Sequence, residues 1–323
     1  MNNYFSTFIS GFAGFVEEQL KVFDPEVEII KLLDGMVIFN TIKPIEAVKN
    51  ISFLNNTFQL IDMSDNKKGI DDYVNYLVQS KAFTKDMVFI PKKNLFFRVT
   101  VSSMGNLIGL GSQLSHGVED KISKTFNIKV DRALPDSEFW IFEREGGVYL
   151  FGHRITYHQD YKDTLLKGEL RPDLSNILCY LSEPNREDVF MDPFSGSESI
   201  IKARSKILGC KKIISSDIKF FGDKKIDALN LSDIGDSTIT KIVTDPPWGI
   251  NVGKNLDLNS FYSRMLGEFH RVLKTGGILV LLVADSVLFG EILKGFVSKY
   301  TLSKYYDILV SGKKARVYKI IKI

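Results

Sequence analysis

The chain has 323 residues, 44% of them hydrophobic and 25% charged, a length and balance that predict two or three globular domains. Its net charge of +3 permits a nucleic-acid partner without requiring one. Cys179 and Cys210 show no metal-ligand spacing and the longest apolar run, "GILVLLVADSVLF", is broken by Asp285, so we expect reduced thiols, no bound metal, no signal peptide or membrane span, and a cytoplasmic location.

The N-terminal half alternates short strands and helices. "NYFSTFIS" predicts a strand, "GFVEEQLKVF" a helix, and "VEIIKLLDGMVIFNT" two strands around a turn at Asp34 and Gly35. No long run typical of a parallel sheet occurs here. We assign residues 1–52 to an N-terminal segment of mixed helices and strands.

A second small unit begins near Phe53. "NLFFRVTVSS" predicts a strand, "GVEDKISKTFNI" an amphipathic helix, and "EFWIFEREGGVYLFG" two strands around Gly146 and Gly147. We assign residues 53–153 to this unit and residues 154–170 to a linker. The basic residues of this unit are candidate phosphate-binding residues: Lys92, Lys93, Arg98, Lys121, Lys124 and Arg132.

The pattern changes after Arg154. "DVFMD", "KIISSD", "TKIVTD" and "GILVLLVAD" are short apolar runs that each end in an aspartate, which predicts a parallel sheet over residues 171–323. Because ligands bind beyond the carboxyl ends of such strands, Asp192, Asp217 and Asp245 are expected at one rim. For Asp285 we expect a helix cap. In "RVLKTGGILV" we expect a helix that stops at the glycines.

Two of these strand ends carry further signals. After "VFM" comes a turn with small residues before a helix, which permits close approach of a ligand to the backbone. The candidate cofactor-binding residues of this turn are Asp192, Pro193, Phe194, Ser195, Gly196 and Ser197. Asp217, at the next strand end, is placed to accept hydrogen bonds from ribose hydroxyls. The strand "KIVT" must stop at Asp245, because Pro246 and Pro247 cannot donate to a sheet.

The paired motifs "MDPFSGSESI" and "IVTDPPWG" resemble those of amino-methyltransferases that use S-adenosylmethionine. "VDRALPDSEFWIFEREGGVYLFG" resembles the end of a THUMP domain, and "YFSTFISGFAGFVEEQL" resembles the opening segment of THUMP-containing tRNA methyltransferases. The resemblance implies a class I, Rossmann-like methyltransferase domain preceded by an α+β ferredoxin-like and THUMP module. It implies N2-methylation of a guanosine in tRNA, and it leaves open a small activating subunit.

The "TDPPWG" motif suits methyl transfer on chemical grounds as well. A base amino group is a poor nucleophile, because its lone pair is delocalised into the ring. The Asp245 carboxylate and the Pro246 carbonyl can each accept one N–H and aim the lone pair at the methyl donor. Trp248 would stack on the base. The catalytic candidates are therefore Asp245, Pro246, Pro247 and Trp248.

Two features depart from the family pattern. Glu198 stands where the family has glycine, and the span from Asp217 to Thr244 is shorter than usual, although Asp227 and Ala228 resemble the pair that meets the adenine of the cofactor. Two alternatives therefore stay open. One is an adenine-N6 methyltransferase acting on RNA or DNA, and the other is an RNA-binding scaffold with a degenerate methyltransferase domain.

Overall fold

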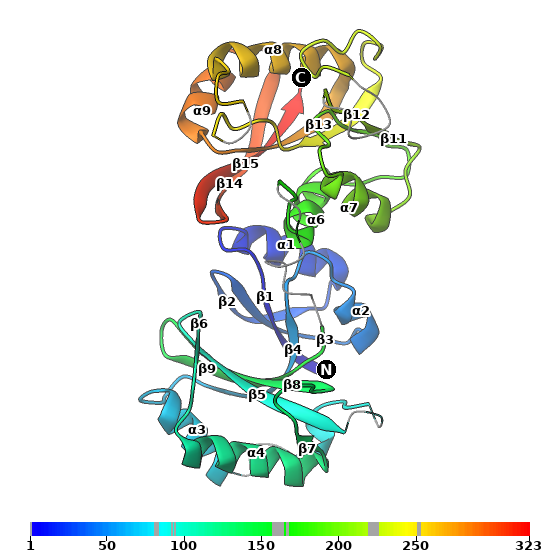
Figure 1. Cartoon of the computed structure of the whole chain (residues 1–323). Helices are drawn as coiled ribbons and strands as arrows, with labels where there is room; N and C mark the ends of the chain where they lie inside the picture. Colours follow the sequence, from blue (N-terminus) through cyan, green and yellow to red (C-terminus); the bar gives the residue numbers. More distant parts are fainter. Residues whose placement is uncertain are drawn as a thin grey trace. The chain divides into compact units, whose positions relative to one another are not determined.

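The computed structural model describes residues 2–80, 84–91, 93, 95–156, 165, 168–218, 226–250 and 253–323. The chain divides into two compact units: the first comprises Met1–Phe8 and Ala13–His158, and the second comprises Ile9–Phe12 and Gln159–Ile323. In Figure 1 each unit is seen to be built around a β-sheet with helices against it. In the described parts of the chain, no helix is long and apolar enough to cross a membrane.

The described strands of the first unit form one nine-stranded sheet in the order β2-β3-β1-β4-β9-β8-β5-β6, with β7 paired to β5. The strands are β1 (Asn2–Thr7), β2 (Glu28–Leu33), β3 (Met36–Thr41), β4 (Thr57–Ser64), β5 (Phe96–Ser103), β6 (Asn106–Ile108), β7 (Lys129–Val130), β8 (Ser137–Arg144) and β9 (Val148–Arg154). Pairing is antiparallel except between β5 and its neighbours β7 and β8. Because β1 pairs with both β3 and β4, the segments 1–52 and 53–153 contribute to the same sheet.

The helices of the first unit are α1 (Ala13–Phe23), α2 (Ile45–Lys49), α3 (Ile70–Gln79), a 3₁₀ turn (Lys85–Met87) and α4 (Ser112–Phe126). The amphipathic helix expected over "GVEDKISKTFNI" is α4, which buries Val118, Ile122 and Phe126 at helical spacing and ends at Asn127 in a left-handed conformation. Together α3 and α4 cover one face of the sheet (Figure 1) and close a hydrophobic core with Phe97, Phe139 and other residues of the strands.

The described strands of the second unit form a six-stranded sheet in the order β11-β10-β12-β13-β15-β14. Its strands are β10 (Val189–Asp192), β11 (Lys212–Ser215), β12 (Ile239–Thr244), β13 (Leu273–Val283), β14 (Tyr300–Val310) and β15 (Lys313–Lys322). The first four are parallel, as the apolar runs ending in aspartate predicted, whereas β14 and β15 form an antiparallel hairpin at one edge. All carboxyl ends of the parallel strands therefore meet at one rim.

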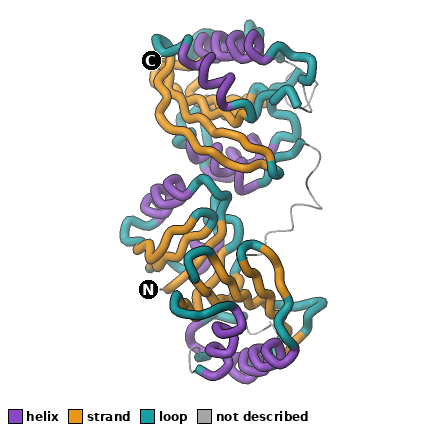
Figure 2. The backbone as a smooth tube through the Cα atoms, turned by 90° about the vertical axis from the view of Figure 1, so that its left-hand side faces the viewer, coloured by secondary structure: helices purple, strands orange, loops and turns teal. Residues whose placement is uncertain are grey.

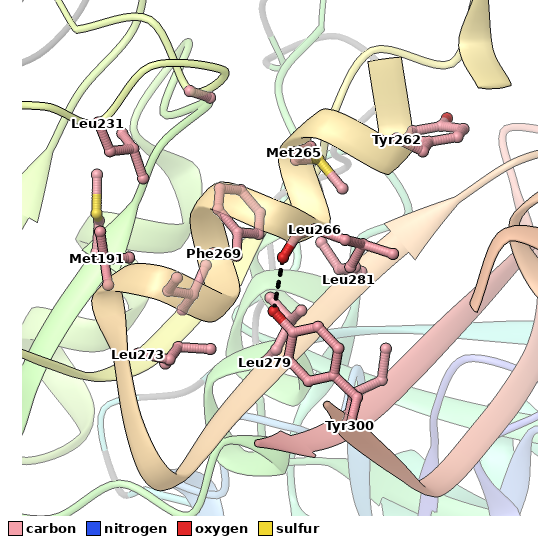
Figure 3. Packing of buried hydrophobic residues seen from close by; sticks show 14 of the residues in the cluster. Met191, Leu231, Tyr262, Met265, Leu266, Phe269, Leu273, Leu279, Leu281 and Tyr300 are labelled. Carbon is pink, nitrogen blue, oxygen red and sulfur yellow. Dashed lines mark hydrogen bonds between the residues drawn. The ribbon is translucent and has the colours of Figure 1, made fainter. Parts of the chain in front are cut away.

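The helices in the described part of the second unit are α6 (Pro172–Leu181), α7 (Ser199–Ile207), α8 (Leu258–Val272) and α9 (Ser286–Lys294). They lie on both sides of the sheet, with α8 and α9 on one face and α6 and α7 on the other (Figures 1 and 2). Helix α8 presents Met265, Leu266 and Phe269 to β13 (Figure 3). The Tyr300 hydroxyl donates to the Leu266 carbonyl at 3.0 Å, so this core also satisfies its buried polar group.

The expected glycine stop after α8 is wrong. The helix ends at Val272, and Gly276 and Gly277 lie within β13. Strand β13 pairs with β12 through a shifted register at this point, and a Cβ on Gly277 would lie only 2.7 Å from the Lys274 carbonyl oxygen. The glycines therefore serve an irregular start of the strand, where backbones approach closely, rather than the end of the helix.

Candidate active site

Three predicted aspartates follow neighbouring parallel strands at the same rim of the sheet. Asp192 is the last residue of β10, Asp217 follows β11 after one intervening residue, and Asp245 follows β12 directly. The charge of Asp217 acts on Asp192, and that of Asp192 acts on Asp245. The structure thus brings the two predicted motifs together at adjacent strand ends.

A buried hydrogen bond joins the two motifs directly. Asp192 is 1% exposed, and its Oδ1 accepts from the Thr244 hydroxyl at 2.6 Å and from the Phe194 amide at 3.1 Å. Burial raises the pKa of Asp192 to about 7; the two donors oppose that rise, while the charges of Asp217 and Glu198 add to it. Thr244 was not singled out in the sequence, since a threonine at the end of a strand is unremarkable.

The turn after β10 is held against the end of β11. The Ser195 amide and hydroxyl both donate to the Ser216 carbonyl at 3.0 Å, and the Gly196 amide donates to Asp217 Oδ2 at 3.2 Å. Gly196 has a φ of +45°, and a Cβ there would meet nothing closer than 3.9 Å, so the turn stays open on that side. Ser197 bonds to Ser199 at 2.9 Å, at the start of α7.

Glu198 directly precedes α7 and has a left-handed backbone conformation, with φ +62° and ψ +23°. A side chain in this region costs about 1–2 kcal/mol, which explains why glycine is the easier choice here. The Glu198 carboxylate accepts from the Ser215 hydroxyl at 3.0 Å. The side chain is therefore bound to the end of β11.

Hydrogen bonds from Trp248 and Tyr262 hold the loop after β12 in place. Trp248 donates its indole N–H to Asp245 Oδ1 at 2.7 Å and, more weakly, to the Leu282 carbonyl at 3.3 Å. The Tyr262 hydroxyl of α8 donates to the Pro247 carbonyl at 3.0 Å. Gly249 follows with φ +74°, where a Cβ would lie 2.9 Å from a Leu258 methyl carbon. The positive φ therefore favours glycine at this turn away from the strand.

Enclosure of the Asp245 carboxylate raises its pKa to about 7. The Trp248 hydrogen bond opposes that rise, and the charge of Asp192 adds to it. Tyr262 lies close enough to feel the charge of Asp245, although burial is the main cause of its own raised pKa. Tyr262 was not singled out in the sequence, where its only distinguishing feature is its place on the apolar face of α8.

The remaining predicted residues have local roles. Asp285 caps α9 as expected, since its Oδ1 accepts from the Leu288 amide at 2.9 Å. Asp227 is exposed and closes its own turn by accepting from the Leu229 amide at 2.9 Å, and Ala228 packs in the core of the second unit. Pro193 and Phe194 lie in the turn after β10, where Phe194 packs against Phe261.

Half of the predicted phosphate-binding residues have internal partners. Arg98 forms an ion pair with Glu138, Arg132 binds both oxygens of Glu119 at 3.0 and 2.8 Å, and Lys121 donates to the carbonyls of Val78 and Ser80. Lys93 and Lys124 are exposed, and Lys92 lies outside the described residues. Where the structure describes the chain, no group of three or more His, Cys, Asp or Glu side chains is arranged to hold a metal ion.

Comparisons with known proteins bear on the fold that carries this site. Residues 212–308, which include β11 to β13 and the Asp245 loop, match the family model described as RMKL-like, methyltransferase domain. TrmN from Thermus thermophilus is similar with a TM-score of 0.77 and 18% identity, over 100% of this chain and 100% of TrmN. No curated protein matches the sequence.

Two further solved structures are similar over nearly the whole chain. SMU.472, complexed with SAH, has a TM-score of 0.66 and 12% identity, over 98% of this chain and 97% of its own. A predicted N6-adenine-specific DNA methylase from Listeria monocytogenes str. 4b F2365 has a TM-score of 0.66 and 13% identity, over 98% of this chain and 95% of its own. The chain therefore has a class I methyltransferase fold preceded by a mixed α/β unit, and residues 212–308 carry the sequence pattern of a methyltransferase domain.

Proposed function

We propose that the protein transfers a methyl group from S-adenosylmethionine to the exocyclic N2 amine of a guanosine in tRNA. The observation that carries the proposal is the 2.6 Å hydrogen bond between Thr244 and Asp192, which fixes the Asp-Pro-Pro-Trp loop beside the small-residue turn in a methyltransferase fold. An amine held by the Asp-Pro-Pro-Trp loop would then lie next to a cofactor held by the small-residue turn. This adjacency supplies the proximity that a two-substrate transfer needs.

The residues of the turn fit the cofactor. Ser195, Gly196 and Ser197 form an open turn before α7, which permits close approach of a ligand to the backbone, and Asp217 lies beside this turn as a hydrogen-bond acceptor. We assign Asp192 to Ser197 and Asp217 to cofactor binding, and Asp227 with Ala228 to the adenine end. S-adenosylmethionine, when bound, supplies a methyl group activated by a positively charged sulfur.

The loop after β12 provides the groups that orient the amine. The Asp245 carboxylate accepts one N–H, and the Pro246 carbonyl accepts the other, since the Pro247 carbonyl already accepts from Tyr262 at 3.0 Å. Asp245 is also placed to take up the proton that the nitrogen loses. The ring of Trp248 provides a stacking surface for the base, a contact of about 1–3 kcal/mol.

The first unit is the proposed RNA platform. We divide it into a ferredoxin-like segment at 1–52 and a THUMP-like domain at 53–153, followed by a linker at 154–170 and the catalytic domain at 171–323. Lys93 and Lys124 remain the exposed candidates for phosphate contacts in the described residues. The likeness to TrmN over the full length of both chains supports this arrangement, and we infer a cytoplasmic location with tRNA as substrate.

Adenine N6 is the second candidate acceptor. It is favoured by the likeness to the predicted N6-adenine-specific DNA methylase, which spans 98% of this chain. An adenine amine could present the same two N–H groups to Asp245 and Pro246, so the loop alone does not discriminate between the bases.

Nucleoside mass spectrometry tests the proposal. Unmodified tRNA incubated with the protein and S-adenosylmethionine should yield N2-methylguanosine. Asp245→Ala should lower turnover by about 10²–10³, because it removes a preorganised acceptor, while calorimetry should show cofactor binding retained. Detection of N6-methyladenosine instead would identify adenine as the acceptor base and leave the proposed mechanism unchanged. Cofactor binding without transfer to any RNA, or full activity of Asp245→Ala, would contradict the proposed chemistry.

A further inference from the structure

The indole N–H of Trp248 has an unusual partner for a residue expected to serve as a stacking platform. It donates to Asp245 Oδ1 at 2.7 Å, whereas its contact with the Leu282 carbonyl is longer, at 3.3 Å. A hydrogen bond to a carboxylate is charge-assisted and stronger than one between neutral groups. The indole is therefore oriented mainly by Asp245, and the carboxylate is oriented by the indole in turn.

This contact gives the two oxygens of the Asp245 carboxylate different roles. Among the described residues, the donor to the Asp245 carboxylate is the indole N–H of Trp248, and it binds Oδ1. The other oxygen, Oδ2, would then be the acceptor available to a substrate amine. A carboxylate held at one oxygen cannot rotate freely about its Cβ–Cγ bond, so the position of Oδ2 is fixed before the substrate arrives.

The surroundings of Asp245 disfavour its ionised form, so the hydrogen bond from the indole matters for its protonation state. Asp245 interacts electrostatically with Asp192 at the end of β10 and with Tyr262 on α8; Asp217 and Glu198 act in turn on Asp192, and Asp285 acts on Tyr262. All of these are acidic or neutral. The Trp248 hydrogen bond opposes the effects of burial and of Asp192 on the pKa of Asp245, which lies near 7.

We propose that Trp248 is a positioning residue that acts through its indole N–H, clamping Asp245 Oδ1 so that Oδ2 alone receives the substrate amine. The proposal rests on the proposed amine methylation and adds to the stacking role of the ring face. A phenylalanine could stack on a base but has no N–H to donate. The two roles are therefore separable by substitution.

A fluorescence titration tests the contact without any assay of activity. Trp140 and Trp248 are the two tryptophans of the chain, so Trp140→Phe leaves Trp248 as the single reporter. Its emission should change with pH, with a midpoint near pH 7, as Asp245 ionises beside the indole. The same titration in Trp140→Phe/Asp245→Asn should keep only the smaller change caused by Asp192, which titrates in the same range but is not bonded to the indole. A flat titration with Asp245 present, or an unchanged one in the double variant, would overturn the proposal.

Kinetics test the consequence for the reaction. Trp248→Phe should lower kcat by about tenfold or more while changing the KM for tRNA little, and the acid limb of its pH profile should move to higher pH, because the ionised carboxylate has lost its donor. Tyr262→Phe is the matched control: it removes the hydrogen bond to the Pro247 carbonyl but leaves the indole contact, so its acid limb should stay in place.

The outcomes separate this proposal from the proposed function. If Trp248→Phe keeps both the wild-type kcat and the wild-type acid limb, Trp248 is a stacking residue only and the inference is wrong. If the wild-type protein methylates no nucleic acid, the proposed function fails, while the fluorescence titration still decides whether the indole clamps Asp245.

Discussion

Each carboxylate at the rim of the second sheet has its own hydrogen-bond donor. The pairs are Asp192 with Thr244, Glu198 with Ser215, Asp217 with the Gly196 amide, and Asp245 with Trp248. Asp192 is buried, and it needs such a partner most, because an unpaired charge in a dry site is costly. The rim can therefore concentrate negative charge while each side chain keeps a defined position.

Glu198 allows a test at the scale of one residue. Glu198→Ala keeps the left-handed strain and loses the Ser215 bond, so we expect it to destabilise the second unit by about 1 kcal/mol. Glu198→Gly loses the same bond but relieves the strain, and should be more stable than the alanine variant by about 1 kcal/mol. Urea unfolding followed by Trp248 fluorescence in a Trp140→Phe background measures both. Equal stabilities would show that the position is not strained.

The ends of strands β10 and β12 are held together at the site, because the Thr244 hydroxyl of β12 donates to the Asp192 carboxylate of β10. The raised pKa of Asp192, about 7, means that the folded protein binds a proton that the unfolded chain releases between about pH 4 and pH 7. This group therefore lowers the free energy of unfolding as the pH rises through that window. Above pH 7 the ionised carboxylate depends most on its donors.

Thr244→Val tests this dependence. At pH 8 the substitution should lower the free energy of unfolding by about 1–3 kcal/mol, because it removes a donor from a buried carboxylate. At pH 5.5, where Asp192 is protonated in the folded state, the loss should be smaller. Urea unfolding at the two pH values makes the comparison. The same loss at both would mean that the effect comes from packing and not from the charge.

At the scale of the whole molecule, the question is which surface attracts tRNA. Lys93 and Lys124 of the first unit are exposed, as are Lys313 and Lys314 of the hairpin in the second unit. Lys93→Glu/Lys124→Glu should weaken tRNA binding and flatten its dependence on salt by about one unit of log–log slope per lost phosphate contact. Lys313→Glu/Lys314→Glu is the charge-matched control, which should bind as the wild type does. The reverse result would move the RNA platform to the hairpin.

Local patterns were enough to predict much of this protein. Apolar runs ending in aspartate predicted the parallel strands β10 to β13, and Pro246 correctly predicted the end of β12 at Thr244. The hairpin around Gly35 and helix α4 also follow from turn residues and helical periodicity. These features depend on neighbours in the chain, so the sequence alone contains their cause.

The donors at the site depend on the tertiary structure. Thr244 is 52 residues from Asp192, and Tyr262 reaches the Asp245 loop from α8, so no local pattern links them. The same holds for Arg98 and Arg132, whose carboxylate partners lie on other elements of the first unit. A basic residue looks available in sequence, but only the fold decides whether a carboxylate already neutralises it. The sequence determined where the chain turns, and packing decided which polar groups meet, because long-range contacts form only when the sheet is assembled.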